Sequence, residues 1–138
     1  MEKEKKALIE LRDGRKNGLS EVVSLLLYYE TIANANRKEM YGYTPLYIAC
    51  YRGYIEVVSL LLNHGANVNQ PKNTGTTPLY IACANGYVEI VSLLLKNGAN
   101  VNQANNNGYT PLYIASAHGH VQVVSLLLKF NGKLLFIK

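Results

Sequence analysis

Two cysteines and three histidines are the side chains in this sequence best suited to chemistry. They are Cys50, Cys83, His64, His118 and His120. Thiolate and imidazole groups are common zinc ligands, but zinc sites are usually built from closely spaced pairs such as Cys-x-x-Cys or His-x-x-x-His. The sequence contains neither pair, and its two cysteines stand far apart. We therefore expect no metal ion and no cofactor.

A catalytic nucleophile would need a neighbouring base that an acid holds in place. No nucleophile-elbow motif marks a serine for that role. Glu56 and Glu89 stand at the same place in two similar stretches, which argues against a pair of carboxylates acting on one substrate. Asn131-Gly132-Lys133 lacks the first glycine and the spacing of a phosphate-binding loop. We expect that the chain is not an enzyme.

Composition and charge exclude several further classes of protein. The chain has 138 residues, of which 49% are hydrophobic and 17% charged, with a net charge of +5. This balance is typical of a folded globular domain. No apolar run reaches the roughly 18 residues of a membrane span, and the charged residues 1–6 lead into no secretory segment. Beyond residue 39 the basic side chains are scattered singly, whereas nucleic-acid binding needs them clustered. We expect a cytoplasmic protein that binds neither membrane nor nucleic acid.

A period of 33 residues organises the sequence. Residues 42–74 and 75–107 are similar along their whole length, and residues 108–138 begin in the same way and then diverge. A degenerate earlier copy is visible from Gly18 to Leu27. We divide the single domain, residues 1–138, into a degenerate amino-terminal capping repeat at 1–37, repeats at 38–70, 71–103 and 104–132, and an apolar tail at 133–138.

Each unit is predicted to fold as a helix, a turn, a second helix and a loop. Threonine followed by proline, as at Thr44 and Pro45, starts a helix because the hydroxyl accepts an unpaired amide. A glycine such as Gly53 can take positive φ where that helix ends. The second helix has apolar residues at a three-to-four spacing. The Asn-Val-Asn-Gln stretch and the Asn- and Gly-rich residues after it indicate an extended crossing and a tight turn. One unit cannot bury its own apolar side, so stacked copies must share a core, as in an all-α solenoid.

The recurring motifs closely resemble those of the ankyrin repeat. They are Gly-x-Thr-Pro-Leu-Tyr-x-Ala at the start of a unit, Gly-Tyr or Gly-His between its helices, and Leu-Leu-x-x-Gly-Ala-Asn-Val-Asn at its end. The resemblance covers residues 18–132 and implies an elongated, L-sectioned stack, in which turn tips project beside a concave surface of first helices. It also implies an interaction module or scaffold that binds a protein partner through those tips and helices.

Two features qualify this resemblance. The family usually has histidine after Thr-Pro-Leu, where this chain has Tyr47, Tyr80 and Tyr113. Either these rings simply pack along the stack, which we favour, or they bind a partner.

Cys50 and Cys83 occupy the same place in successive units, so we expect about 8–10 Å between them, beyond the roughly 7 Å that a disulfide allows. We expect two small, buried and reduced side chains.

Partner-binding positions are expected where the copies differ while their neighbours stay fixed. Such positions lie at the turn tips 39–41, 72–74 and 105–107 and at the ends of first helices. The predicted partner-binding residues are Met40, Tyr41, Tyr43, Tyr51, Arg52, Asn73, Thr74, Thr76, Asn85, Asn106, Asn107, Tyr109 and His118. The first repeat combines three of these tyrosines with methionine and arginine, and tyrosine and arginine dominate interface hot spots. The alternative is that tyrosine is simply abundant, with eleven in the chain.

The carboxyl end departs from the pattern. Lys129-Phe130-Asn131-Gly132 looks one residue longer than the corresponding Lys96-Asn97-Gly98, and an apolar segment replaces the polar loop. This tail is predicted to fold back over the last helix pair or to pack against a second copy of the chain, which makes the chain a monomer or a weak homodimer through its carboxyl-terminal face. The alternatives to partner binding are such an architectural, self-associating role and, less favoured, a nucleic-acid-binding or enzymatic variant of the fold.

Overall fold

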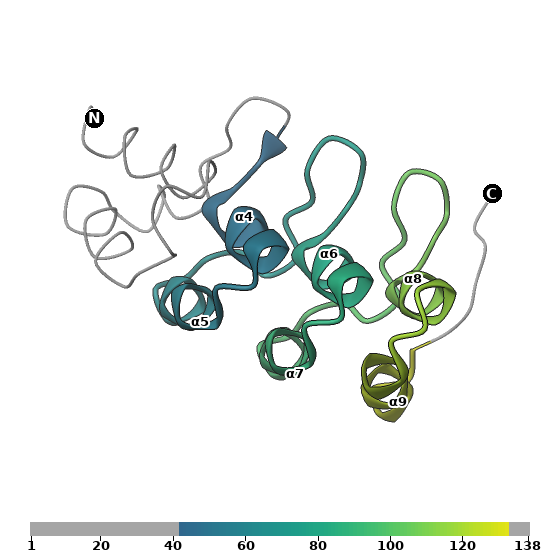
Figure 1. Ribbon diagram of the computed structural model, residues 1–138. Helices are drawn as coiled ribbons and strands as arrows, with labels where there is room; N and C mark the ends of the chain where they lie inside the picture. Colours follow the sequence, from purple (N-terminus) through teal and green to yellow (C-terminus); the bar gives the residue numbers. More distant parts are fainter. Residues whose placement is uncertain (1–41, 133–138) are drawn as a thin grey trace.

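Residues 42–132 of the computed structural model are described, and they fold into three helix pairs stacked in a row (Figure 1). The helices of this part are α4 (Pro45–Arg52), α5 (Ile55–Asn63), α6 (Pro78–Asn85), α7 (Val88–Lys96), α8 (Pro111–Ala117) and α9 (Val121–Lys129). Each first helix contacts its own second helix and the first helix of the next pair. The predicted all-α solenoid of stacked helix-turn-helix-loop units is therefore confirmed. The predicted capping repeat at 1–37 and the tail at 133–138 lie outside the described residues.

The threonine–proline dipeptides start the first helices as predicted. Thr44, Thr77 and Thr110 each precede a helix whose first residue is proline, and each has extended backbone angles. The Thr77 hydroxyl accepts a hydrogen bond from Tyr80 N at 3.0 Å, and the other two threonines make the same bond at 3.1 and 3.2 Å. All three threonines are buried. Their hydroxyls satisfy amide groups that would otherwise be left unpaired inside the stack.

Glycines at the ends of α4 and α6 each receive a ring from the next pair. Gly86 has φ +75°, a left-handed conformation that glycine adopts without steric cost. His120 lies where a side chain would otherwise sit, because a β-carbon added at Gly86 would be 2.7 Å from His120 Nδ1. Gly53 meets the ring of Tyr87 in the same way one repeat earlier. His120 Nε2 also donates to Ala84 O at 3.0 Å, so this histidine links the last pair to α6.

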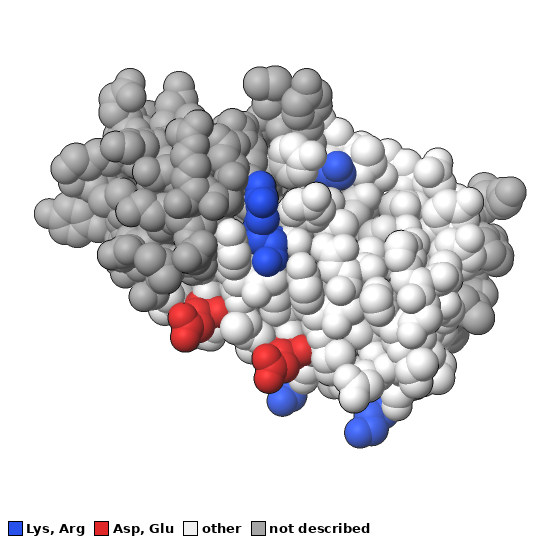
Figure 2. Space-filling view, viewed as in Figure 1, with Lys and Arg blue, Asp and Glu red and all other residues white. Residues whose placement is uncertain are grey.

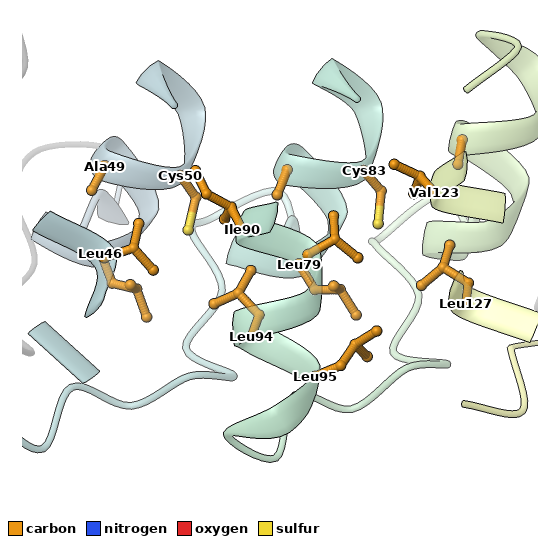
Figure 3. Close-up of a cluster of buried hydrophobic side chains, with 14 of the residues drawn as sticks. Leu46, Ala49, Cys50, Leu79, Cys83, Ile90, Leu94, Leu95, Val123 and Leu127 are labelled. Atoms are coloured by element: carbon orange, nitrogen blue, oxygen red, sulfur yellow. The ribbon is translucent and has the colours of Figure 1, made fainter. Parts of the chain in front are cut away.

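A continuous apolar core runs through the described stack (Figure 3). First helices contribute small side chains such as Ala49 and Cys50, and second helices contribute larger ones such as Val91 and Leu94. These four residues have no exposed surface. The small residues let successive first helices approach closely, while the larger ones fill the space between second helices. Truncating one such leucine to alanine costs about 2–5 kcal/mol in proteins generally.

The loop after α5 begins with a turn, not with an extended crossing. Asn69 N donates to Asn67 Oδ1 at 3.0 Å, and Gln70 N donates to Asn67 O at 3.3 Å. The predicted extended crossing is therefore wrong here, because an asparagine side chain binds the backbone two residues further on. The predicted tight turn that follows is confirmed, since Lys72 N donates to Thr76 O at 3.0 Å.

Asparagine side chains also link each loop to the next repeat. Asn69 Nδ2 donates to Gly98 O at 3.3 Å, and Asn69 Oδ1 accepts from Asn100 N at 2.8 Å. One repeat later, Asn102 Nδ2 donates to Asn131 O at 3.2 Å. Each of these bonds joins only neighbouring repeats, so the loops hold the stack in register one step at a time.

The last described helix ends where the period of 33 residues requires. Asn131 has φ +69° and follows α9 as Gly98, with φ +90°, follows α7. Gly132 N then donates to Leu127 O at 2.8 Å, a bond that Ala99 makes one repeat earlier. The prediction of one extra residue at this end is therefore wrong. Asparagine takes the left-handed position here, since it tolerates that conformation better than other residues with a side chain.

Candidate functional site

A pocket of about 480 Å³ lies between the first two described repeats. We call it the tyrosine pocket. Its lining residues come from the start and end of α4, from α6 and from the turn between α5 and α6, and they are Tyr43, Tyr47, Ile48, Tyr51, Arg52, Lys72 and Ile81. Three of them, Tyr43, Tyr51 and Arg52, were predicted as partner-binding residues from the sequence. The structure brings these three together around one hollow. Met40 and Tyr41 lie outside the described residues.

The walls of the tyrosine pocket are fixed by the helices that carry them. Tyr47 follows the capped amino terminus of α4 and is 4% exposed, and its ring centroid lies 5.5 Å from that of Tyr43. Ile48 is buried, and Ile81 comes from the same position of the next first helix. Tyr51 is 50% exposed at the last turn of α4. The pocket therefore combines a rigid apolar base with one aromatic ring that is open to solvent.

Two cations of the tyrosine pocket lie against aromatic rings. Lys72 Nζ is 4.9 Å from the ring centroid of Tyr43 and 5.6 Å from that of Tyr47. Arg52 Cζ is 5.7 Å from the ring centroid of Tyr51. These distances are within the range of cation–π attraction, which holds a cation over a ring and limits the conformations of its side chain. Burial raises the pKa of the Tyr47 phenol, and the neighbouring Tyr43 raises it further. The Tyr47 phenol therefore stays neutral beside the two cations.

The equivalent surface between α6 and α8 has a different chemistry. Asn85 and Asn105 stand there in place of Arg52 and Lys72. Asn85 Nδ2 donates to Tyr51 O at 3.1 Å, and Asn105 Oδ1 accepts from Tyr109 N at 3.1 Å. The Asn85 amide therefore bonds back to the end of α4, and the Asn105 oxygen holds the turn before α8. We call the surface between two successive first helices a seam; of the two seams within residues 42–132, only the one between α4 and α6 carries basic side chains, Arg52 and Lys72.

The predicted residues at the turn tips mainly connect one tip to the next. Asn106 Nδ2 donates to Asn73 O at 3.1 Å, and Asn106 N donates to Thr74 O at 3.0 Å. Asn73, Thr74, Asn106 and Asn107 are exposed, so their outer surfaces remain open to a partner. Thr76 is only 8% exposed, and its hydroxyl lies 2.7 Å from Thr74 Oγ1. We therefore assign Thr76 to the support of the turn and remove it from the proposed contact surface.

The remaining predicted residues lie around α8, away from the tyrosine pocket. The Tyr109 ring stacks on Tyr113, with centroids 4.5 Å apart and 13° between the ring planes. His118 is exposed, as expected for a variable position, and its ring centroid lies 5.9 Å from that of His120. These are two separate pairs of rings, one at the start of α8 and one just after its end.

The two cysteines are buried in the core, as predicted. Burial raises the pKa of the Cys50 and Cys83 thiols, and the neighbouring Cys83 raises that of Cys50 further. A thiol that stays protonated is a poor nucleophile. Within residues 42–132, no group of three or more His, Cys, Asp or Glu side chains could hold a metal ion. The helices of this same part are at most nine residues long, and none has the length and apolar character to cross a membrane.

Four lining residues of the tyrosine pocket were not predicted as site residues. Tyr47 and Ile48 are identical in every copy, so a search for variable positions passes over them. Ile81 belongs to the next repeat and reaches the pocket only through stacking. Lys72 stands at a turn tip, and its replacement by Asn105 in the next copy was the one signal that could have selected it.

Comparison with known families agrees with this architecture. A family profile described as ankyrin repeats (3 copies) matches residues 15–72 and 70–135. These matches cover most of the 138 residues, and the chain belongs to the ankyrin-repeat family. Ankyrin repeats are generally protein–protein interaction modules. A search of curated proteins finds no similar sequence.

Proposed function

We propose that this chain is a cytoplasmic scaffold that binds a protein partner through its first helices and turn tips, and that it is not an enzyme. The tyrosine pocket is the observation that carries the proposal. It gathers Tyr43, Tyr51 and Arg52, which differ between repeats, over an apolar base that does not. Exposed aromatic and arginine side chains around a preformed hollow are the usual anchors of protein interfaces. The buried, protonated thiols suit a reducing compartment and a role in packing.

A selection from a random peptide-display library tests this proposal even while the natural partner is unidentified. Enriched peptides are measured by calorimetry against the full chain and against a Tyr51→Ala/Arg52→Ala double variant. We expect the double variant to lose about 2 kcal/mol or more of binding free energy, roughly a thirtyfold loss of affinity. A Glu89→Ala/Lys96→Ala double variant, altered at the exposed ends of α7, is the matched control and should bind normally. Peptides that bind the Tyr51→Ala/Arg52→Ala variant equally well place the site elsewhere, and a selection that enriches nothing contradicts the proposal.

Self-association through the carboxyl-terminal face is the second candidate. Large apolar side chains are exposed on α9 and just after it, with Val121 76%, Leu128 56% and Phe130 38% exposed. In a solenoid, each pair covers the apolar side of the pair before it, and exposed apolar side chains on the last described pair favour association. Analytical ultracentrifugation over a hundredfold range of concentration tests this role, since a sedimentation coefficient that stays at the value of a monomer excludes it.

A further inference from the structure

We propose that the tyrosine pocket selects an extended peptide segment in which an Asp or Glu side chain neighbours an apolar side chain. The inference rests on the proposed function and adds the chemistry of the partner. It depends on the shape of the pocket, on its charge and on the contrast with the next seam. Each of these is a property of residues 42–132.

The apolar part of the pocket suits a side chain of the partner. Its volume of about 480 Å³ lies within the range of pockets that enclose a ligand. Ile48 and Ile81 come from two successive first helices, and the Tyr47 ring adds an aromatic wall that is almost fully buried. An apolar side chain placed here would lose its contact with water against surfaces that are already rigid. Little conformational entropy is lost by the pocket on binding, which favours affinity.

The charge of the pocket favours an anion beside that apolar side chain. Lys72 and Arg52 line it, and no acidic residue within 42–132 does so. The acidic residues of this described range are Glu56 and Glu89, which lie in the first turns of α5 and α7. Figure 2 shows basic side chains over α4 and the loop before α6, acidic side chains below them, and two further basic groups at the lower edge of the molecule. A partner carboxylate beside Lys72 would thus meet no competing carboxylate from these residues.

The geometry favours a carboxylate over a phosphate. Phosphorylated motifs are usually recognised by clusters of arginine, whose forked donors match a phosphate group. Here one arginine and one lysine come from different elements, and each lies against an aromatic ring. A single carboxylate beside Lys72 needs no such cluster. The cation–π contacts hold the positive charges near the apolar wall, where a neighbouring carboxylate and apolar side chain would both find a contact.

The contrast with the next seam fixes where the acidic residue binds. Asn105 replaces Lys72 there, while Asn85, which replaces Arg52, bonds back to Tyr51 O across the first seam. A peptide lying across the first helices would therefore meet Lys72 and Arg52 at the first described seam, and Asn105 in place of Lys72 at the second. This difference sets the register of the acidic residue along the stack.

Fluorescence polarisation with synthetic peptide pools tests the assignment on the full chain. One pool has degenerate octapeptides that pair Glu with Leu or Phe, the second replaces Glu by Gln, the third replaces it by Lys, and the fourth by phosphoserine. We expect the Glu pool to bind about tenfold more tightly than the Gln pool, and the difference to shrink as salt screens the charges. Lys72→Gln should remove most of that preference. Lys96→Gln, which makes the same charge change at the end of α7, should leave it intact.

Each other result overturns a defined part of the proposal. Equal affinity for the Glu and Gln pools, or a preference that Lys72→Gln does not alter, overturns the acidic assignment and leaves the proposed function standing. Preference for the Lys pool, or binding of the phosphoserine pool alone, also overturns it. If none of the pools binds, the acidic assignment is overturned. Peptides from the display selection that bind through Tyr51 and Arg52 would then still support the proposed function, whereas a selection that enriches no peptide contradicts the proposed function as well.

Discussion

Replacing Gly86 by alanine should destabilise the chain more than the same replacement at Gly119. Both glycines follow a first helix with nearly the same conformation, φ +75° at Gly86 and +73° at Gly119. A β-carbon added at Gly86 would lie 2.7 Å from Nδ1 and 2.8 Å from Cε1 of the His120 ring. A β-carbon added at Gly119 would meet no atom within 4 Å in the part of the chain that the structure describes. The two variants therefore share the backbone strain and differ in the contact.

The magnitudes follow from these two contributions. An alanine in the left-handed region costs about 1–2 kcal/mol, which is the whole expected effect of Gly119→Ala. Gly86→Ala adds about 1–3 kcal/mol, because the His120 ring must move in a packed interface. Moving the ring also weakens the bond from His120 Nε2 to Ala84 O, worth about 0.5–1.5 kcal/mol. We expect Gly86→Ala to lose roughly two to three times the stability that Gly119→Ala loses.

Urea unfolding followed by far-ultraviolet circular dichroism measures both losses, and a double-mutant cycle isolates the contact. In a His120→Ala background the ring is absent, so the extra cost of Gly86→Ala should disappear and only the backbone strain should remain. The slope of the unfolding transition should be similar in all variants, which checks that the same surface is exposed. If Gly86→Ala costs the same with and without the histidine ring, the contact between the two residues does not cause the difference from Gly119→Ala.

Three further predictions concern a helix start, the thiols and the tail. Thr77→Val should lower the unfolding free energy by about 1 kcal/mol in urea titrations, because Tyr80 N loses its acceptor. Stability should fall as pH rises above about 8.5, since the buried Cys50 and Cys83 thiols keep their protons in the folded state but lose them on unfolding, by at most about 1.4 kcal/mol per pH unit for each thiol. Cys50→Ala should reduce this slope, and an unchanged slope would contradict the cause. Removal of residues 133–138 should lower the melting temperature, increase light scattering or abolish a dimer, because exposed Phe130 indicates an apolar surface nearby. A truncated chain that is equally stable and keeps the same oligomeric state would show that the tail has no such role.

The positions of the helices could be predicted from the sequence because each start and end depends on one local contact. Thr77 caps α6 with its own hydroxyl, and Gly86 supplies the conformation that ends the helix. The two wrong predictions, at the end of α9 and in the loop after α5, both concern positions where asparagine fixes the backbone conformation. Asn131 takes the left-handed position that glycine takes elsewhere, so a comparison of letters alone added a residue that the backbone does not have. The Asn67 side chain accepts a hydrogen bond from Asn69 N and so forms a turn, where the sequence had predicted an extended segment.

The site was predicted less completely than the fold, because it depends on contacts between repeats. Tyr51 and Arg52 could be selected as variable residues at a helix end. Lys72 lies twenty positions further along the chain, and only stacking brings its ammonium group over the Tyr43 ring. Thr76 also varies between copies, yet it faces inward, because its hydroxyl pairs with a neighbouring threonine. Variation between copies therefore indicates where to look, but burial decides which side chains a partner can touch.

The asparagine links between loops also determine how the stack should respond to a pulling force. Asn69 and Asn102 each bind a carbonyl group of the next repeat and of no other described repeat. A chain stretched from its two ends would therefore break these links one after another. Each repeat of 33 residues that detaches would release on the order of 110 Å of extended chain. Under tension the protein would lengthen in equal steps as single repeats detach, and it would shorten by the same steps as they fold back onto the stack.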